Sequence, residues 1–176
     1  MALVPGKRVQ YGDRTFVVGS HVVLAHPWLL PQHRFELHDG SDTVLWLDIQ
    51  IHSWGYNGVW VVTPQEYSGL IPADDPSDLE FAGRSFSPGL WGTNYHYTPD
   101  NYPERPSGIV KYFKYNPNDR RGEFGFMLPG SDALHFQRFD NGPWIVSLAQ
   151  EVQATDLVVL YPKVRDVRMG QAIWCY

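Results

Sequence analysis

The chain has 176 residues, of which 43% are apolar, 14 are basic and 19 are acidic. This length suits one domain, and the apolar content supports a buried core without disulfides or metals, which excludes general disorder. The net charge of −5, with basic residues scattered and never clustered beyond a pair such as Arg120-Arg121, argues against a nucleic-acid partner. No window approaches a membrane-spanning run, no export signal is visible, and the single cysteine, Cys175, fits a reducing compartment. We therefore expect a cytoplasmic protein with no membrane insertion.

Apolar and polar residues alternate along most of the chain, which predicts short antiparallel strands. In chain order the expected strands are 8–11, 15–24, 34–37, 44–51, 59–62, 109–115, 123–128, 133–139 and 144–152. Dipeptides that tight hairpins prefer lie between them: Gly12-Asp13, Asp39-Gly40, Asn57-Gly58 and Asn141-Gly142. No helical period holds for three turns, and at most one short helix or turn is expected near 64–68 or 157–165. The pattern predicts an all-β fold.

Two stretches of sequence recur in the same order. Residues 9–19 align without a gap on 79–89, and residues 57–62 align on 141–146. We therefore expect an antiparallel sandwich or irregular barrel made of two duplicated strand meanders with approximate two-fold symmetry. The expected organisation is a single domain over 1–176, with halves 7–67 and 78–152, a linker at 71–78 and a C-terminal extension at 153–176.

The aligned residues make two specific predictions about equivalent positions. Trp60 and Trp144 are expected to occupy equivalent sites in the two halves. Arg14 and Arg84 are expected to play equivalent roles, each binding a carboxylate or carbonyl groups beside a turn.

The order of these signals also resembles a known family. The succession runs from Gly6-Lys7-Arg8-Val9 and Phe16-Val17-Val18-Gly19 through Trp28, Phe35-Glu36-Leu37, Leu45-Trp46-Leu47-Asp48 and 79–86 to 108–115 and 144–152. It is similar to the bacterial family catalogued as domain of unknown function 4178, over about Gly6 to Val152. The resemblance rests on glycines and aromatic residues, and it carries no catalytic residue to this chain. It implies a bacterial cytoplasmic accessory domain, from a family whose members occur near genes for phage-shock-type membrane stress proteins and polyamine-synthase-like proteins.

Side chains that could bind metals or catalyse a reaction form no recognised motif. None of the seven histidines stands in a ligand spacing, so neither a metal ion nor a cofactor is predicted: His21, His26, His33, His38, His52, His96 and His135. There is no nucleophile elbow, and Cys175 has no neighbouring base. The pairs Glu36 with Asp48 and Glu104 with His96 are conceivable acid–base pairs that the sequence does not constrain. No catalytic residue is assigned.

One aromatic segment, residues 91–106, stands out. The separation of Gly89 from Phe113 exceeds that of Gly19 from Phe35 by eight residues, and the added residues are polar, aromatic and Pro-rich. The tyrosines either cover the open end of the core or belong to a recognition loop for a sugar, planar ligand or peptide. The candidate binding residues are Trp91, Asn94, Tyr95, His96, Tyr97 and Tyr102, together with Trp54 and Tyr56.

Two functions follow from these features. The first is a non-catalytic binding or interaction module that recognises a small molecule, glycan or protein partner through the aromatic loop, and it can form a homo-oligomer. The alternative is a small lipocalin-like or barrel enzyme, of lyase, isomerase or cyclase type, that acts on a hydrophobic or phenolic substrate by His, Tyr and carboxylate acid–base chemistry. A solvent-connected pocket of several hundred cubic ångströms lined by Tyr, His and a carboxylate favours the enzyme, whereas a filled core with outward aromatics favours the module.

Overall fold

The computed structural model describes residues 3–26, 29–41, 44–51, 57–69, 71, 77–99, 108–120, 132–161 and 164–168. The elements in these ranges are β1 (Arg8–Tyr11), β2 (Arg14–His26), β3 (Leu29–His38), β4 (Val44–Ile51), β5 (Asn57–Pro64), β6 (Leu79–Phe81), β7 (Arg84–Pro99), β8 (Gly108–Pro117), η1 (Asn118–Arg120), β9 (Asp132–Phe139), β10 (Ile145–Glu151), η2 (Ala154–Asp156), β11 (Leu157–Tyr161) and β12 (Val164–Arg168). The predicted all-β fold is confirmed. The expected strand at 123–128 lies outside the described residues.

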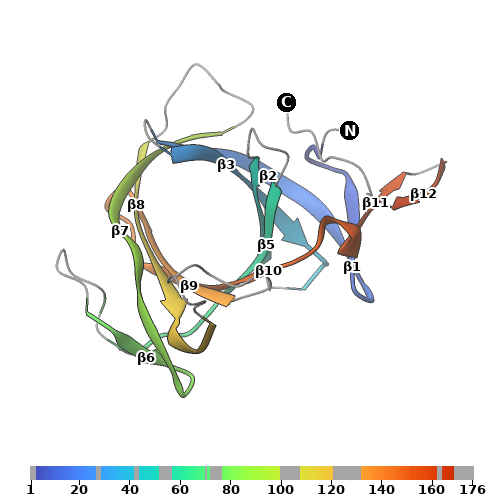
Figure 1. The fold of residues 1–176 in the computed structure, drawn as a ribbon. Coiled ribbons are helices and arrows are strands. Elements are labelled where there is room, and N and C mark those ends of the chain that lie inside the picture. Colours follow the sequence, from blue (N-terminus) through green and yellow to red (C-terminus); the bar gives the residue numbers. More distant parts are fainter. Residues whose placement is uncertain are drawn as a thin grey trace.

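Eight of the described strands close into an antiparallel barrel, which Figure 1 shows as a ring seen end-on. The order around the ring is β2-β3-β4-β5-β10-β9-β8-β7, and β2 pairs with β7 to complete it. This closing contact joins residues 22–25 to residues 96–99. The sequence left a sandwich and a barrel open, and the β2–β7 pairing decides for the barrel because it leaves the ring without free edges.

The two halves of the chain supply strands to the barrel in the same order. Each half starts with a short hairpin strand, β1 or β6, and continues with four consecutive barrel strands. Val9 lies opposite Phe16 in the first hairpin, and Leu79 lies opposite Phe86 in the second. This is the register expected when residues 9–19 align on 79–89. The pairings β2–β7 and β5–β10 then join one half to the other.

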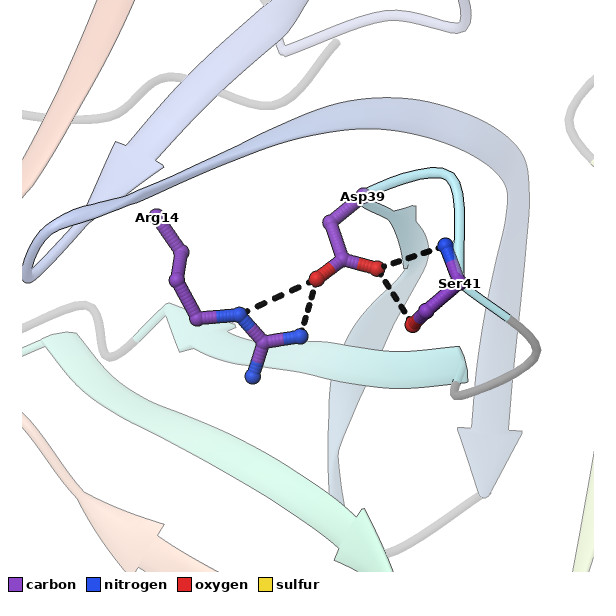
Figure 2. A network of polar contacts seen from close by, with 3 residues as sticks. All are labelled: Arg14, Asp39 and Ser41. Atoms are coloured by element: carbon purple, nitrogen blue, oxygen red, sulfur yellow. Dashed lines mark hydrogen bonds and ion pairs between the residues drawn. The ribbon is translucent and has the colours of Figure 1, made fainter.

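Arg14 and Arg84 bind carboxylates at corresponding places. Figure 2 shows Arg14, at the start of β2, bound through Nε and Nη2 to Asp39, which follows β3 and also accepts hydrogen bonds from the Ser41 amide and hydroxyl. Together the Ser41 hydrogen bonds and Arg14 hold the pKa of Asp39 well below its usual range. Arg84, at the start of β7, pairs with Asp119, which follows β8, and with Asp132 at the start of β9, at 3.1 and 3.0 Å. The predicted equivalence of the two arginines is confirmed.

Alternation along the strands gives the barrel sheet an apolar outer face. Phe35 lies opposite Leu47, and both pack in a cluster with Val9 of β1 and Leu157 of β11. Figure 1 places β1 and β11 outside the ring, so these side chains point away from the barrel axis. A second outer cluster, centred on Phe113, Phe136, Tyr115 and Leu134, is covered by β6. The main apolar cores therefore lie outside the barrel.

The barrel interior is lined by the opposite face of the same strands. Arg34 lies opposite Asp48 on this face, one residue from the outward Phe35 and Leu47. At one end of the interior, an apolar cluster fills the space with Leu24, Tyr95, Val110 and Tyr112, supported by Val22, Tyr97 and Phe139. The rest of the interior carries polar side chains together with apolar ones such as Trp60 and Val62.

The prediction of a loop at residues 91–106 is wrong for its first part. The segment up to Pro99 continues β7, whose residues 93–97 pair with β8 and whose residues 96–99 pair with β2. The alternating aromatic and polar side chains of this segment satisfy a strand of which one face is buried. The added length therefore closes the barrel. The remaining part, 100–106, lies outside the described residues.

The alignment of residues 57–62 on 141–146 differs by one residue from the correspondence that the strand pairing gives. Asn57 and Gly58 pair with Ile51 and Gln50 inside the β4–β5 ladder, whereas 141–142 form the turn between β9 and β10. The predicted hairpin turn at 57–58 is thus wrong, because both residues are themselves part of strand β5.

The predicted equivalence of the two tryptophans fails for the same reason. Trp60 lies opposite Asp48, and Ile145 takes the corresponding place opposite Gln137. Trp144 precedes β10 and packs on the outer face.

The described residues of 157–165, where the sequence allowed at most a short helix or turn, are in strands. Residues 157–161 form β11, which pairs with β1 on one side and β12 on the other. The run Leu157-Val158-Val159-Leu160-Tyr161 is rich in β-branched residues, and its inward members pack on the first outer cluster. The short η1 and η2 are the helical segments found in the described part of the chain, and within that part no helix is long and apolar enough to cross a membrane.

Candidate ligand-binding site

A pocket of about 130 Å³ lies inside the barrel. Side chains from six strands line it: Gln32, Gln50, Trp60, Tyr95, Tyr112, Lys114 and His135. These residues share the inward face with Arg34 and Asp48, since Gln32 lies opposite Gln50 and Lys114 lies opposite His135. Closure of the sheet therefore brings together residues that are far apart in the sequence.

A buried ion pair forms the polar floor beside this pocket. Arg34 donates from Nε to Asp48 at 2.7 Å and from Nη2 to the other carboxylate oxygen at 2.5 Å. Gln32 adds a hydrogen bond to Asp48 at 2.6 Å, and Arg34 reaches Gln137 with its remaining amine at 2.5 Å. Burial opposes the charge of Arg34, but the charge and hydrogen bonds of Asp48 outweigh it and raise the pKa of Arg34. The guanidinium also lies over the Trp46 ring, 5.0 Å from its centroid.

An aromatic wall continues from this floor. The Tyr112 ring makes edge contacts with Tyr95 at 5.6 Å and with His135 at 5.2 Å between ring centroids. Burial raises the pKa of Tyr112 well above its usual value, and it also raises the pKa of Tyr95. Burial, with Lys114 and Arg34 nearby, lowers the pKa of His135 well below its usual value. Both phenols and the imidazole are therefore neutral near pH 7.

Lys114 brings a cationic group into the same pocket. Its Nζ lies 5.8 Å from the centroid of the Trp60 ring, which belongs to a strand three places away in the barrel. Burial lowers the pKa of Lys114, and the charge of Glu151 opposes this effect only in part. Among the described residues no ion pair to Lys114 is found.

Several buried polar atoms beside the pocket have no hydrogen-bond partner among the described residues. They are Nδ1 of His135, Nε2 of Gln137 and Oγ of Ser147. His135 is 4% exposed and the other two are fully buried. His135 and Ser147 lie opposite each other on β9 and β10, so their groups share one region of the interior. Unpaired buried polar atoms are uncommon, and they mark places where a ligand or water completes the hydrogen bonding.

The structure separates the predicted binding residues Tyr95, His96 and Tyr97. Tyr95 is buried and lines the pocket. His96, the next residue on β7, is exposed and faces the other way. Tyr97 returns to the inner face, packs on Phe139 and donates a hydrogen bond to Asp140 at 2.8 Å. The three side chains therefore do not form one outward contact surface, and Tyr95 is the one placed at the site.

The other predicted binding residues lie beyond what the structure describes. The backbone of Trp91 and Asn94 belongs to β7, but their side chains are outside the described set. Tyr102, Trp54 and Tyr56 lie in undescribed segments.

The conceivable acid–base pairs receive no support as pairs. Asp48 is held by Arg34 and Gln32, while Glu36 lies opposite Trp46 and is 3.7 Å from His38. Glu104, proposed as a partner of His96, is not among the described residues. No group of three metal-ligating side chains suited to an ion occurs in the described ranges.

Sequence reasoning missed most of the pocket. Arg34, Asp48, Lys114, His135 and Gln137 occupy the polar positions of alternating strands, a pattern that ordinarily indicates a solvent-facing side. Aromatic residues on both faces of 109–115 were the available signal that neither face is open to water.

No family model, no curated protein and no solved structure matches the chain. Comparison with known proteins therefore does not identify the site.

Proposed function

We propose that this protein is a non-catalytic binding module whose barrel interior takes up a small molecule. The observation that carries the proposal is the interior pocket, where side chains of six strands converge beside unpartnered polar atoms. Its volume of about 130 Å³ accommodates several water molecules or one small organic molecule. In this proposal the contact surface includes the inner face of β7 at Tyr95.

A comparison of corresponding positions in the two halves supports a specialised interior. On the outer face Phe35 corresponds to Phe113 and Leu47 to Phe136, as the strand registers place them, so apolar residues stand in both halves. On the inner face the residues differ in chemistry. Arg34 corresponds to Tyr112, and Asp48 corresponds to Gln137. The shared architecture requires the outer core, whereas the asymmetric interior suits a ligand.

The alternative, acid–base catalysis on a hydrophobic or phenolic substrate, has less support. The pocket is smaller than several hundred cubic ångströms, and its described lining contains Tyr and His but no carboxylate. Asp48, the carboxylate beneath it, accepts three hydrogen bonds from Arg34 and Gln32. A carboxylate held in this way is a structural group and a poor general base. A bacterial, cytoplasmic accessory role is the expectation from the family resemblance that accompanies this proposal.

The test is titration of isotope-labelled protein with indole, benzyl alcohol, benzamide and benzoate, followed by NMR. At least one probe is expected to shift resonances of Tyr95, Lys114 and His135 and to leave the outward His96 unchanged. Gln50→Phe, which fills the pocket, should weaken that probe about tenfold or more, whereas His96→Phe on the outer face should not. Shifts confined to outward residues would reject an interior site.

A further inference from the structure

Several polar groups around the pocket can donate hydrogen bonds for which no acceptor is found among the described residues. Both oxygens of Asp48 already accept hydrogen bonds from Arg34 or Gln32. The Oε1 of Gln137 accepts from Arg34, so its unpartnered amide nitrogen is a donor. The hydroxyl of Ser147 and the ammonium of Lys114 are further donors. A ligand rich in acceptor atoms would complete this set.

The charges of the interior side chains also favour a ligand that carries acceptor atoms. Arg34 and Asp48 neutralise each other, which leaves Lys114 as the cation that faces the pocket without an ion pair among the described residues. Glu151, at the end of β10, favours the charged form of Lys114, but burial outweighs it. An anionic group seated beside Lys114 would supply the missing counter-charge, and charge-assisted hydrogen bonds are the stronger kind.

The remaining lining is aromatic. Trp60 lies beside the Lys114 ammonium, and the rings of Tyr95 and Tyr112 meet at 5.6 Å on another side of the pocket. Such surfaces suit a flat or aliphatic body attached to the anionic group. The pocket volume of about 130 Å³ limits that body to roughly the size of one aromatic ring.

We infer that the interior site binds a small organic carboxylate, with its carboxylate against Lys114 and the donors of Ser147 and Gln137, and with its apolar body against Trp60 and Tyr95. This inference rests on the proposed binding function and narrows it to one ligand class.

The experiment compares acids with their neutral amides of the same shape. Benzoate and benzamide, phenylacetate and phenylacetamide, and acetate and acetamide are each titrated into the full-length protein at pH 7 by calorimetry and NMR. At least one acid is expected to bind about tenfold or more tighter than its amide, with resonance shifts at Lys114 and Ser147.

Two lysine variants provide the matched control. Lys114→Met should remove the preference for the acid while leaving the amide affinity within about threefold, because the aromatic walls remain. Lys111→Met should keep the preference, since Lys111 lies on the same strand over Phe113 of the outer face, 5.5 Å from that ring. Lys114→Arg should retain part of the preference for the acid, because it keeps the positive charge.

The outcomes separate the two proposals. Acid and amide that bind equally well, with shifts at the interior residues, would reject the carboxylate and leave the binding function standing. If none of the six probes and neither indole nor benzyl alcohol shifts an interior resonance, both the carboxylate site and the binding function are rejected. An acid preference that persists in Lys114→Met would place the carboxylate elsewhere and overturn the inference.

Discussion

Arg34 on β3 donates a hydrogen bond across the barrel to Gln137 on β9, with 2.5 Å between Nη1 and Oε1, although three strands separate β3 from β9 in the sheet. Because Arg34 also binds Asp48 through two further hydrogen bonds, one side chain ties the inner faces of the two halves together. This connection supports the floor beside the pocket and gives both Asp48 carboxylate oxygens and Oε1 of Gln137 a hydrogen-bond donor inside the barrel.

Arg34→Met is expected to lower the free energy of unfolding by about 3–5 kcal/mol, because it leaves the charge of Asp48 buried without its partner. Urea denaturation followed by circular dichroism measures the loss. The double variant Arg34→Met with Asp48→Leu should recover much of it, since the unpaired charge is then gone.

The matched control is Arg14→Met. Arg14 also binds a carboxylate, but its side chain is 47% exposed, so a much smaller loss is expected. Equal losses in Arg14→Met and Arg34→Met would contradict the importance of burial.

His135 should make stability dependent on pH below about 6.5. Its folded pKa lies well below its usual value, so below pH 6.5 the unfolded chain takes up a proton that the folded protein does not. Stability from this residue is complete above pH 6.5 and is lost as the pH falls toward the folded pKa, by up to about 1.4 kcal/mol per pH unit. His135→Gln should show a correspondingly shallower decline; identical curves for the two proteins would contradict a buried neutral imidazole.

Lys114→Met is expected to raise the free energy of unfolding at pH 7 by about 0.5–2 kcal/mol. The pKa of Lys114 is lowered in the folded state, so its charge opposes folding until the pH rises toward 10.5, where the unfolded chain also loses the proton. Lys111→Met serves as the comparison and should change little. A less stable Lys114→Met protein would indicate that the lysine supports the fold and is not held for a ligand.

The β6–β7 turn contains a strained residue that should respond to substitution. Ala82 has a φ of 50°, and the following Gly83 has a φ of 73°. Ala82→Gly is expected to stabilise the protein by up to about 1 kcal/mol, because an L side chain disfavours this conformation.

At the corresponding position of the β1–β2 turn, Gly12 has a φ of 61° and nothing within 4 Å of an added Cβ. Gly12→Ala should therefore destabilise by about 1 kcal/mol through the backbone alone. Thermal denaturation of both variants checks these opposite signs, and the same sign in both would refute the account.

Local pattern was sufficient for much of the fold. The bounds of β1 and β4 match the predicted strands 8–11 and 44–51, because alternation and flanking turn residues act over a few positions. The alignment of 9–19 on 79–89 also anticipated the shared hairpin register and the roles of Arg14 and Arg84. It misjudged 91–99, whose Pro and polar residues are typical of a loop, because pairing with β2 and β8 decides that segment.

By itself, then, the sequence determined that the chain forms antiparallel strands with one strongly apolar face and that its halves begin alike. Only the tertiary structure decided which face is enclosed. Alternation distinguishes two faces of a strand but does not say whether the polar one meets water or the inside of a closed sheet. The pairings β2–β7 and β5–β10 join residues distant in sequence, and they close the ring around Arg34, Lys114 and His135. The candidate site exists because of that long-range closure, which no local pattern encodes.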